Sequence, residues 1–164
     1  GNYLLVVGKT SGHLTQSEFF REVMKIENGP PPEINLFNEK NNGLAIQKLI
    51  SKKLLSSVHD VSSGGILLTI AEMCIFGKLG AKIKTPSKYI NAIEYLFAED
   101  QSRYILEVSE KNMKEVSVIL KNNNIYYEIL GKTQKDNLDL DGEFNIKTLD
   151  LEKTNSIWFK NYFN

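Results

Sequence analysis

The stretch Ser56-Ser57-Val58-His59-Asp60-Val61-Ser62-Ser63-Gly64-Gly65 and the apolar run from Ile66 to Phe76 decide the fold class. Residues 56–61 have the composition of a short strand, and the Ser/Gly turn that follows closes it. The run after the turn is apolar nearly all round, which is typical of a buried helix. Gly77 and Gly80 mark the end of that helix. The stretch therefore predicts a strand, a tight turn and a helix covered on all sides.

The rest of the chain predicts further strands and helices that alternate without a strict order. This irregular order favours an α+β protein, with a mixed sheet layered by helices, over a doubly wound parallel sheet. With 164 residues, the chain is expected to form one domain, residues 1–164. The other expected strands are 3–7, 81–84 (half-exposed), 104–108, 125–129 and 143–148, and the other expected helices include 90–97, 111–121 and 151–159.

Two helix starts are indicated between residues 8 and 55. Thr15-Gln16-Ser17-Glu18 matches a capping box, with Thr15 as N-cap and Glu18 three residues later. Gly29-Pro30-Pro31-Pro32 then forces an extended connection, and Asn35 can cap the next helix. The inner face of the first helix is expected to carry Phe19, Phe20, Val23 and Met24, and that of the second Leu36, Leu44, Ile46, Leu49 and Ile50.

Composition excludes several classes of partner. Twenty basic and 20 acidic residues cancel, and no basic run follows a phosphate backbone, so neither nucleic acid nor an anionic membrane is expected as partner. No run approaches the length of a membrane span. The single cysteine, Cys74, lies in an apolar run and is expected to be buried, which suits a reducing cytoplasm.

Three polar segments could carry chemistry. The first is the turn before the buried helix, because free amides and the helix dipole at a helix N-terminus favour an anion. The alternative is that Ser62 or Ser63 simply caps the helix. The candidate anion ligands here are Ser62, Ser63, Gly64 and Gly65.

The second segment is Glu99-Asp100-Gln101, directly before a strand. Adjacent carboxylates and an amide could bind a metal–nucleotide or hold sugar hydroxyls, and a solvated acidic turn is the alternative. Arg103 could pair with Glu99 or Asp100, or be an ordinary surface cation.

The third segment is the polar loop 10–17, in which Gly12 and His13 offer an amide and an imidazole and are further candidate ligands of a phosphate or nucleotide. A lone loop histidine is more often structural than catalytic. No spacing predicts a metal site, and no catalytic residue is assigned.

Taken in order, these segments resemble one family over almost the whole chain, the ATP-dependent synthetase subunit of phosphoribosylformylglycinamidine synthase. Residues 59–65 followed by Ala71-Glu72-Met73 are similar to its "HDVSDGG…AEM", and residues 96–104 to "LFGEDQARY". Residues 8–17 are similar to "GETxGHLGQS", residues 29–32 and 41–43 to a proline stretch and an "RNG" turn, and residues 157–162 to "WxPxYM".

The resemblance implies a fold and an activity. The domain would be the second copy of a C-terminal domain of aminoimidazole ribonucleotide synthetase (PurM-like) type, an α/β/α sandwich with partial ferredoxin-like topology. The parent would convert formylglycinamide ribonucleotide, ATP and glutamine-derived ammonia to formylglycinamidine ribonucleotide. ATP and Mg²⁺ would belong to the parent, with neither bound tightly by this domain. The implied partners are the N-terminal ATP-binding domains of the same subunit and a glutaminase.

Two departures and two rival interpretations qualify this resemblance. Ser63 replaces an aspartate of the family, and Thr15 replaces a glycine. The set Glu99, Asp100, Gln101 and Arg103 is the counterpart of a substrate-contacting motif in the first half of the subunit, and its role here could be structural. The rivals are a C-terminal domain of a related ATP-dependent enzyme, such as thiamine-phosphate kinase, and a non-catalytic assembly domain.

Overall fold

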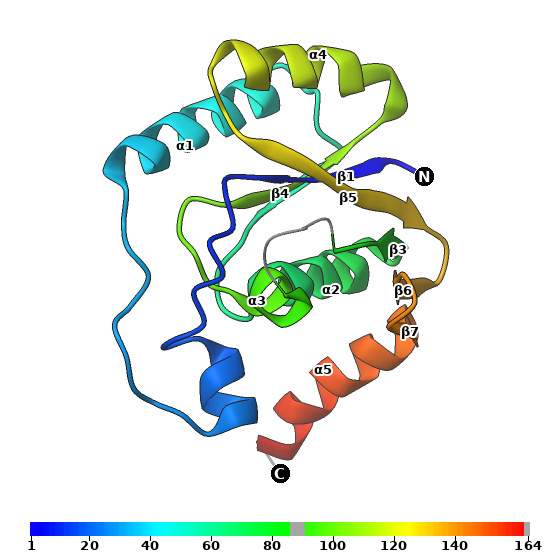
Figure 1. The fold of residues 1–164 in the computed structure, drawn as a ribbon. Helices are drawn as coiled ribbons and strands as arrows, with labels where there is room; N and C mark the ends of the chain where they lie inside the picture. The colour runs from blue at the N-terminus through cyan, green and yellow to red at the C-terminus, as the bar shows by residue number, and fades with distance from the viewer. Residues whose placement is uncertain (86–90, 163–164) are drawn as a thin grey trace.

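A seven-stranded mixed sheet forms the centre of the computed structural model, which describes residues 1–85 and 91–162 (Figure 1). The strand order is β2-β4-β1-β5-β3-β6-β7. The strands are β1 (Tyr3–Val7), β2 (Ser57–Asp60), β3 (Gly80–Ile83), β4 (Tyr104–Val108), β5 (Tyr127–Gln134), β6 (Asn137–Leu140) and β7 (Phe144–Lys147). The helices are η1 (Phe19–Met24, a short π-helix), α1 (Leu36–Ser51), α2 (Gly65–Gly77), α3 (Ala92–Phe97), α4 (Glu110–Asn122) and α5 (Thr148–Tyr162).

Part of the sheet has ferredoxin-like topology. β1 pairs antiparallel with both β4 and β5, and β2 pairs antiparallel with β4. The units β1-α1-β2 and β4-α4-β5 therefore each join two parallel strands across one antiparallel strand, as in a split β-α-β fold. The segment α2-β3-α3 is inserted between the two units. β3, β6 and β7 extend the sheet beyond β5. The predicted α+β class with partial ferredoxin-like topology is confirmed.

Helices cover both faces of the sheet, because neighbouring residues along each strand are apolar and face opposite ways. On β1, Leu4 and Val6 pack with α2 and α3, whereas Leu5 and Val7 pack with α1 and α4. α5 contacts α2 on the first of these faces (Figure 1). α2 buries one face, which carries Ile66, Ile70 and Cys74, whereas Leu68 and Phe76 are exposed. The prediction of a helix covered on all sides is therefore wrong.

Several local expectations are wrong. Thr15 does not cap a helix, because the Glu18 amide that its hydroxyl would accept from donates to Glu99 Oε1 at 2.7 Å instead. The Thr15 hydroxyl donates to the carbonyl of Pro30 at 2.8 Å. The helix begins only at Phe19, and it is the Ser17 hydroxyl that accepts a hydrogen bond from the Phe20 amide in its first turn. η1 has no buried residue, and its Val23 is 63% exposed.

Helix α1 buries only part of the face predicted for it, since Ile46 and Leu49 are buried as expected. Asn35 caps it as expected, accepting from the Asn38 amide at 3.0 Å. Leu36, Leu44 and Ile50 are exposed, however. The buried side chains are Asn42, Ala45, Ile46 and Leu49. The segment 41–43, which is similar to a turn of the family, lies inside this helix.

The sheet extension was predicted only in part. β6 was not expected, and β5 runs to Gln134, past the predicted end at residue 129. β3 is mostly buried instead of half-exposed, because it lies between β5 and β6. Residue 90, the predicted start of the short helix, lies outside the described residues, and α3 begins at Ala92. A turn over residues 141–143 separates β6 from β7.

Candidate functional site

Three polar segments meet at one end of the sheet. β1 and β2 run parallel, with antiparallel β4 between them. The loop after β1, the turn after β2 and the segment before β4 therefore lie at the same end of these strands (Figure 1). The segment before β4 holds Glu99, Asp100, Gln101 and Arg103, and its carboxylates are bonded to the other two segments.

Glu99 connects the segment to two backbone amides. Its Oε1 accepts hydrogen bonds from the amides of Gly64 at 2.8 Å and Glu18 at 2.7 Å. Its own amide donates to the carbonyl of His13 at 3.2 Å. A carboxylate at the first turn of a helix is favoured by the free amides and the helix dipole there. Glu99 is therefore a resident anion at the start of α2.

Asp100 makes the equivalent connection to the loop after β1. Its Oδ2 accepts from the amides of Ser11 at 2.9 Å and Gly12 at 3.1 Å, and the residue is only 8% exposed. Charge-assisted bonds of this kind are stronger than neutral ones. The acidic pair is thus an internal connector, and the solvated acidic turn considered as the alternative is not what the structure contains.

Arg103 is buried, with 1% of its surface exposed. Its guanidinium donates to the carbonyls of Ala98 at 2.6 Å and Asp100 at 3.0 Å, and to the Thr10 hydroxyl at 3.0 Å. Burial lowers the pKa of Arg103, while Asp100, Tyr95 and Glu99 act to raise it. Arg103 is therefore not the ordinary surface cation considered as one alternative. Among the described residues it forms no ion pair with Glu99 or Asp100 either, because its guanidinium donates to two carbonyls and a hydroxyl.

Glycine is required in the turn before α2. Gly65 has φ +67°, and a Cβ there would lie 2.6 Å from the carbonyl oxygen of Ala98. Gly64, also at positive φ, is the N-cap, and no side chain caps the helix. The suggestion that Ser62 or Ser63 caps α2 is therefore wrong; both serines are exposed.

His13 holds the proline stretch against the loop. Its Nε2 lies 3.0 Å from the carbonyl oxygen of Pro30 and 2.8 Å from the Thr15 hydroxyl. A carbonyl only accepts, so the bond to Pro30 places a hydrogen on Nε2. This arrangement matches a structural role for the histidine.

A polar pocket of about 530 Å³ opens beside these connections. Of the predicted residues, Gly12, His13, Asp100 and Gln101 line it. Sequence reasoning did not assign the remaining lining residues, Lys9, Ser11, Glu33, Asn35, Asn38, Asn42 and Ser102. The asparagines at and after the start of α1 could have indicated a polar pocket wall, but the sequence analysis assigned only Asn35 a role, as the helix cap. Hydroxyls, amides and single charges of both signs suit a hydroxylated polar ligand.

Asn42 shows why α1 turns an amide toward this pocket. Its Nδ2 donates to the backbone carbonyl of Ser102 at 2.8 Å and to the Ser102 hydroxyl at 3.1 Å. Ser102 has φ +63°, a left-handed conformation that is unfavourable for a residue with a side chain. Asn42 thus stabilises the strained residue between the acidic pair and β4. No group of three or more His, Cys, Asp or Glu that could hold a metal ion occurs among residues 1–85 and 91–162.

Residues 1–141 match the family described as "AIR synthase related protein, C-terminal domain". The chain belongs to this family. More particularly, it is 50% identical over 161 residues to the phosphoribosylformylglycinamidine synthase subunit PurL of Pelagibacter ubique, covering 98% of this chain and 22% of that protein. It is 35% identical over 162 residues to the same subunit of Rhodopseudomonas palustris, again covering 22% of it. The chain thus spans about a fifth of these relatives, and the resemblance drawn from the motifs is confirmed.

Solved structures share the fold. The structure titled "T. maritima PurL complexed with FGAR" matches with a TM-score of 0.76 at 15% identity, over 92% of this chain and 27% of that one. A thiamine-monophosphate kinase from Stenotrophomonas maltophilia matches with a TM-score of 0.57 at 12% identity, over 87% of this chain and 51% of the kinase. The same fold therefore occurs in one of the rival enzymes.

The two arginines of the chain provide a matched test of the buried guanidinium. Arg103→Lys is expected to lower the free energy of unfolding by about 2–4 kcal/mol, because one ammonium cannot satisfy three separated acceptors. Arg21→Lys, at an exposed ion pair with Glu18, should change it by no more than about 0.5 kcal/mol. Urea unfolding measures both, and equal midpoints for the two variants would contradict the role given to Arg103.

Substituting two glycines at positive φ distinguishes the cost of backbone strain from the cost of a steric clash with neighbouring atoms. Gly142 has φ +81° with no atom within 4 Å of a built Cβ, whereas a Cβ on Gly65 meets backbone oxygen. Gly142→Ala is expected to cost about 1 kcal/mol for φ alone. Gly65→Ala should cost about 1–3 kcal/mol more, because the Ala98 carbonyl must move. Thermal unfolding of both variants tests this, and a similar loss in each would show that the turn tolerates a side chain.

Proposed function

We propose that the chain is a C-terminal domain of a phosphoribosylformylglycinamidine synthase, an ATP-dependent ligase of purine biosynthesis. The observation that supports this most directly is 50% identity to a subunit of that enzyme along 98% of the chain. In the reaction, the amide oxygen of formylglycinamide ribonucleotide is phosphorylated, and ammonia then displaces phosphate. We further propose that residues 1–164 form one domain of the parent, since apolar cores lie on both faces of a single sheet.

The role we assign to this domain is to present a rigid polar wall to the substrate side of the parent. Glu99, Asp100 and Arg103 hold the loops in place through the bonds described above, and Gln101, which is exposed, lines the pocket beside them. Because the acidic side chains are engaged by amides, they position the loops and do not act as general acids or bases. The pocket offers amides and hydroxyls to a ribonucleotide.

The chemistry of ATP is assigned to other parts of the parent. Thermotoga maritima PurL has been solved in complexes with ATP and with ADP. The described part of this chain has no group of three or more His, Cys, Asp or Glu that could hold a metal ion. We therefore place ATP and Mg²⁺ on the N-terminal ATP-binding domains of the same subunit, with ammonia supplied by a glutaminase. A structure titled "PurLQS from Thermotoga maritima" fits a multi-protein assembly.

We place the parent enzyme in the cytoplasm, where this pathway would operate. Among the helices that the structure describes, none has the length and apolar character needed to cross a membrane.

The chain alone is expected to be inactive, and a chimera is expected to be active. Incubated with formylglycinamide ribonucleotide, ATP, Mg²⁺ and ammonium, the 164 residues should give no ADP and no product. Substituted for the matching segment of the Pelagibacter ubique subunit, they should restore turnover with ammonia. Coupled assay of ADP release measures both.

Controls make either outcome decisive. The intact Pelagibacter ubique subunit is the positive control, and the same subunit without the segment is the negative one. A folded but inactive chimera would contradict the proposed function. Turnover by the isolated chain would contradict the assignment of the ATP chemistry to other domains.

Weak anion binding is expected at the start of α2, through Ser62, Ser63, Gly64 and Gly65. Glu99 already accepts from the Gly64 amide, so phosphate or ADP should bind with a dissociation constant of about 1 mM or weaker. Amide resonances of Gly64 and Gly65 should move on titration with either ligand. The amide of Gly142, in the turn before β7, serves as the control. Unmoved Gly64 and Gly65 resonances would remove the anion site.

A further inference from the structure

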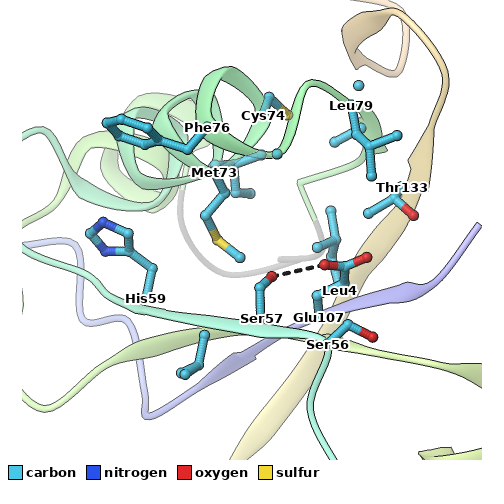
Figure 2. Close-up of a pocket in the computed structure, with 15 residues that line it drawn as sticks. Leu4, Ser56, Ser57, His59, Met73, Cys74, Phe76, Leu79, Glu107 and Thr133 are labelled. Atoms are coloured by element: carbon cyan, nitrogen blue, oxygen red, sulfur yellow. Dashed lines mark hydrogen bonds between the residues drawn. The ribbon is translucent and has the colours of Figure 1, made fainter.

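Figure 2 shows a second cavity, of about 480 Å³. Because Leu4 near the start of β1 and Glu107 near the end of β4 line it, it lies at the opposite end of these strands from the polar pocket. It is lined by the beginnings of β1, β2 and β3 and by the last turns of α2. Its volume falls in the range of small-molecule sites, about 300–1,000 Å³. Nothing in the proposed function uses this cavity.

The walls of the cavity are mainly apolar. Met73, Phe76 and Leu79 line it together with Leu4 and Ile70. Leu4 and Ile70 belong to the buried core, whereas Phe76 is 79% exposed and Leu79 is 41% exposed. A ligand that entered here would cover apolar surface that now meets water, which favours binding.

Among the described residues that line the cavity, the one carboxylate is that of the half-buried Glu107. Glu107 shares a face of β4 with the core residue Ile105, and so lies on the α2 side of the sheet. Its oxygens accept from two neutral donors, the Ser57 hydroxyl at 2.8 Å (Figure 2) and the Asn2 side-chain amide at 2.8 Å. No ion pair of Glu107 with a basic side chain is found in the described part of the chain. The negative charge is therefore hydrogen-bonded but not neutralised.

The other titratable groups around the cavity do not supply a fixed positive charge. Burial, and secondarily the carboxylate of Glu107, raise the pKa of the Cys74 thiol to about 11, so the thiol is neutral at pH 7. At the rim, His59 lies 3.5 Å from an oxygen of Asp60 and 3.8 Å from one of Glu72. The residues that line the cavity include no lysine or arginine. The surroundings are thus apolar and net negative.

We propose that this cavity binds a small organic monocation, an amine or amidine with an apolar body. The carboxylate of Glu107 would pair with the cation, and Met73, Phe76 and Leu79 would cover the apolar part. An opposite charge in a partly buried, apolar-walled site is favoured over a neutral ligand of the same shape, because it compensates a carboxylate that lacks a basic partner.

The three methionines of the chain provide the measurement. Met73 lines the cavity, and Met24 and Met113 do not. With ¹³C-methyl methionine, benzamidinium should shift the Met73 methyl resonance saturably and leave the other two in place. Benzamide, which is neutral and of nearly the same shape, should bind at least about tenfold more weakly. The unshifted Met24 and Met113 resonances also verify that the chain stays folded.

Variants separate the two parts of the site. Glu107→Gln should remove the preference for benzamidinium over benzamide, whereas Glu143→Gln, at an exposed turn, should keep it. Phe76→Ala, at an exposed wall position, should weaken both probes equally. The proposal is overturned if Met73 does not respond to benzamidinium, or if both probes bind equally well to the unmodified chain. Should Glu107→Gln fail to fold, the comparison of the two probes and the Phe76→Ala variant still decide.

Discussion

A buried guanidinium must find hydrogen-bond acceptors, and the way Arg103 meets that requirement organises the end of the sheet where the polar pocket lies. Its acceptors are the carbonyls of Ala98 and Asp100 and the hydroxyl of Thr10. The backbone from 98 to 103 therefore curves around one side chain. In this arrangement the carboxylates of Glu99 and Asp100 are free to accept from the two neighbouring loops. A single buried cation thus fixes the segment 98–103, and that segment fixes the loops after β1 and β2.

The carboxylate of Glu99 changes what the turn before α2 can do. Free amides at a helix start attract any anion, and a side chain of the same molecule competes with a dissolved phosphate. A group held in place by the chain has an effective concentration in or above the millimolar range. Glu99 therefore keeps its hydrogen bond from the Gly64 amide unless the dissolved anion makes further contacts with the protein. The same physics that predicts an anion site here also explains why a resident carboxylate occupies part of it.

Elements that depend on local pattern were predictable, and those that depend on distant partners were not. Strands β1 and β4 and helix α2 are mainly apolar segments, so their limits lie close to those predicted from the sequence alone. β6 is a strand of alternating polar and apolar residues that exists because it pairs with β3, more than fifty positions earlier. The capping box at Thr15 failed for the same reason, because the Glu18 amide donates to the distant carboxylate of Glu99 and not to the Thr15 hydroxyl.

The candidate site shows the same division. The acidic pair, the glycine turn and the loop after β1 were each identified from the residues, but the bonds among them span 35 to 89 positions. The role of Asn42 could not be predicted from the sequence pattern. An asparagine in the middle of a helix is usually exposed, yet here it is buried to support the left-handed Ser102.

A net charge of zero conceals two local environments of different character. At one end of the strands, Lys9, His13, Glu33 and Asp100 line a polar pocket in which charges of both signs occur. At the other, Glu107 lies in an apolar cavity with Asp60 and Glu72 near its rim. Overall charge governs long-range attraction, but discrimination between ligands depends on the charges within a few ångströms. A chain without a global electrostatic preference can therefore favour a hydroxylated ligand at one end and a cation at the other.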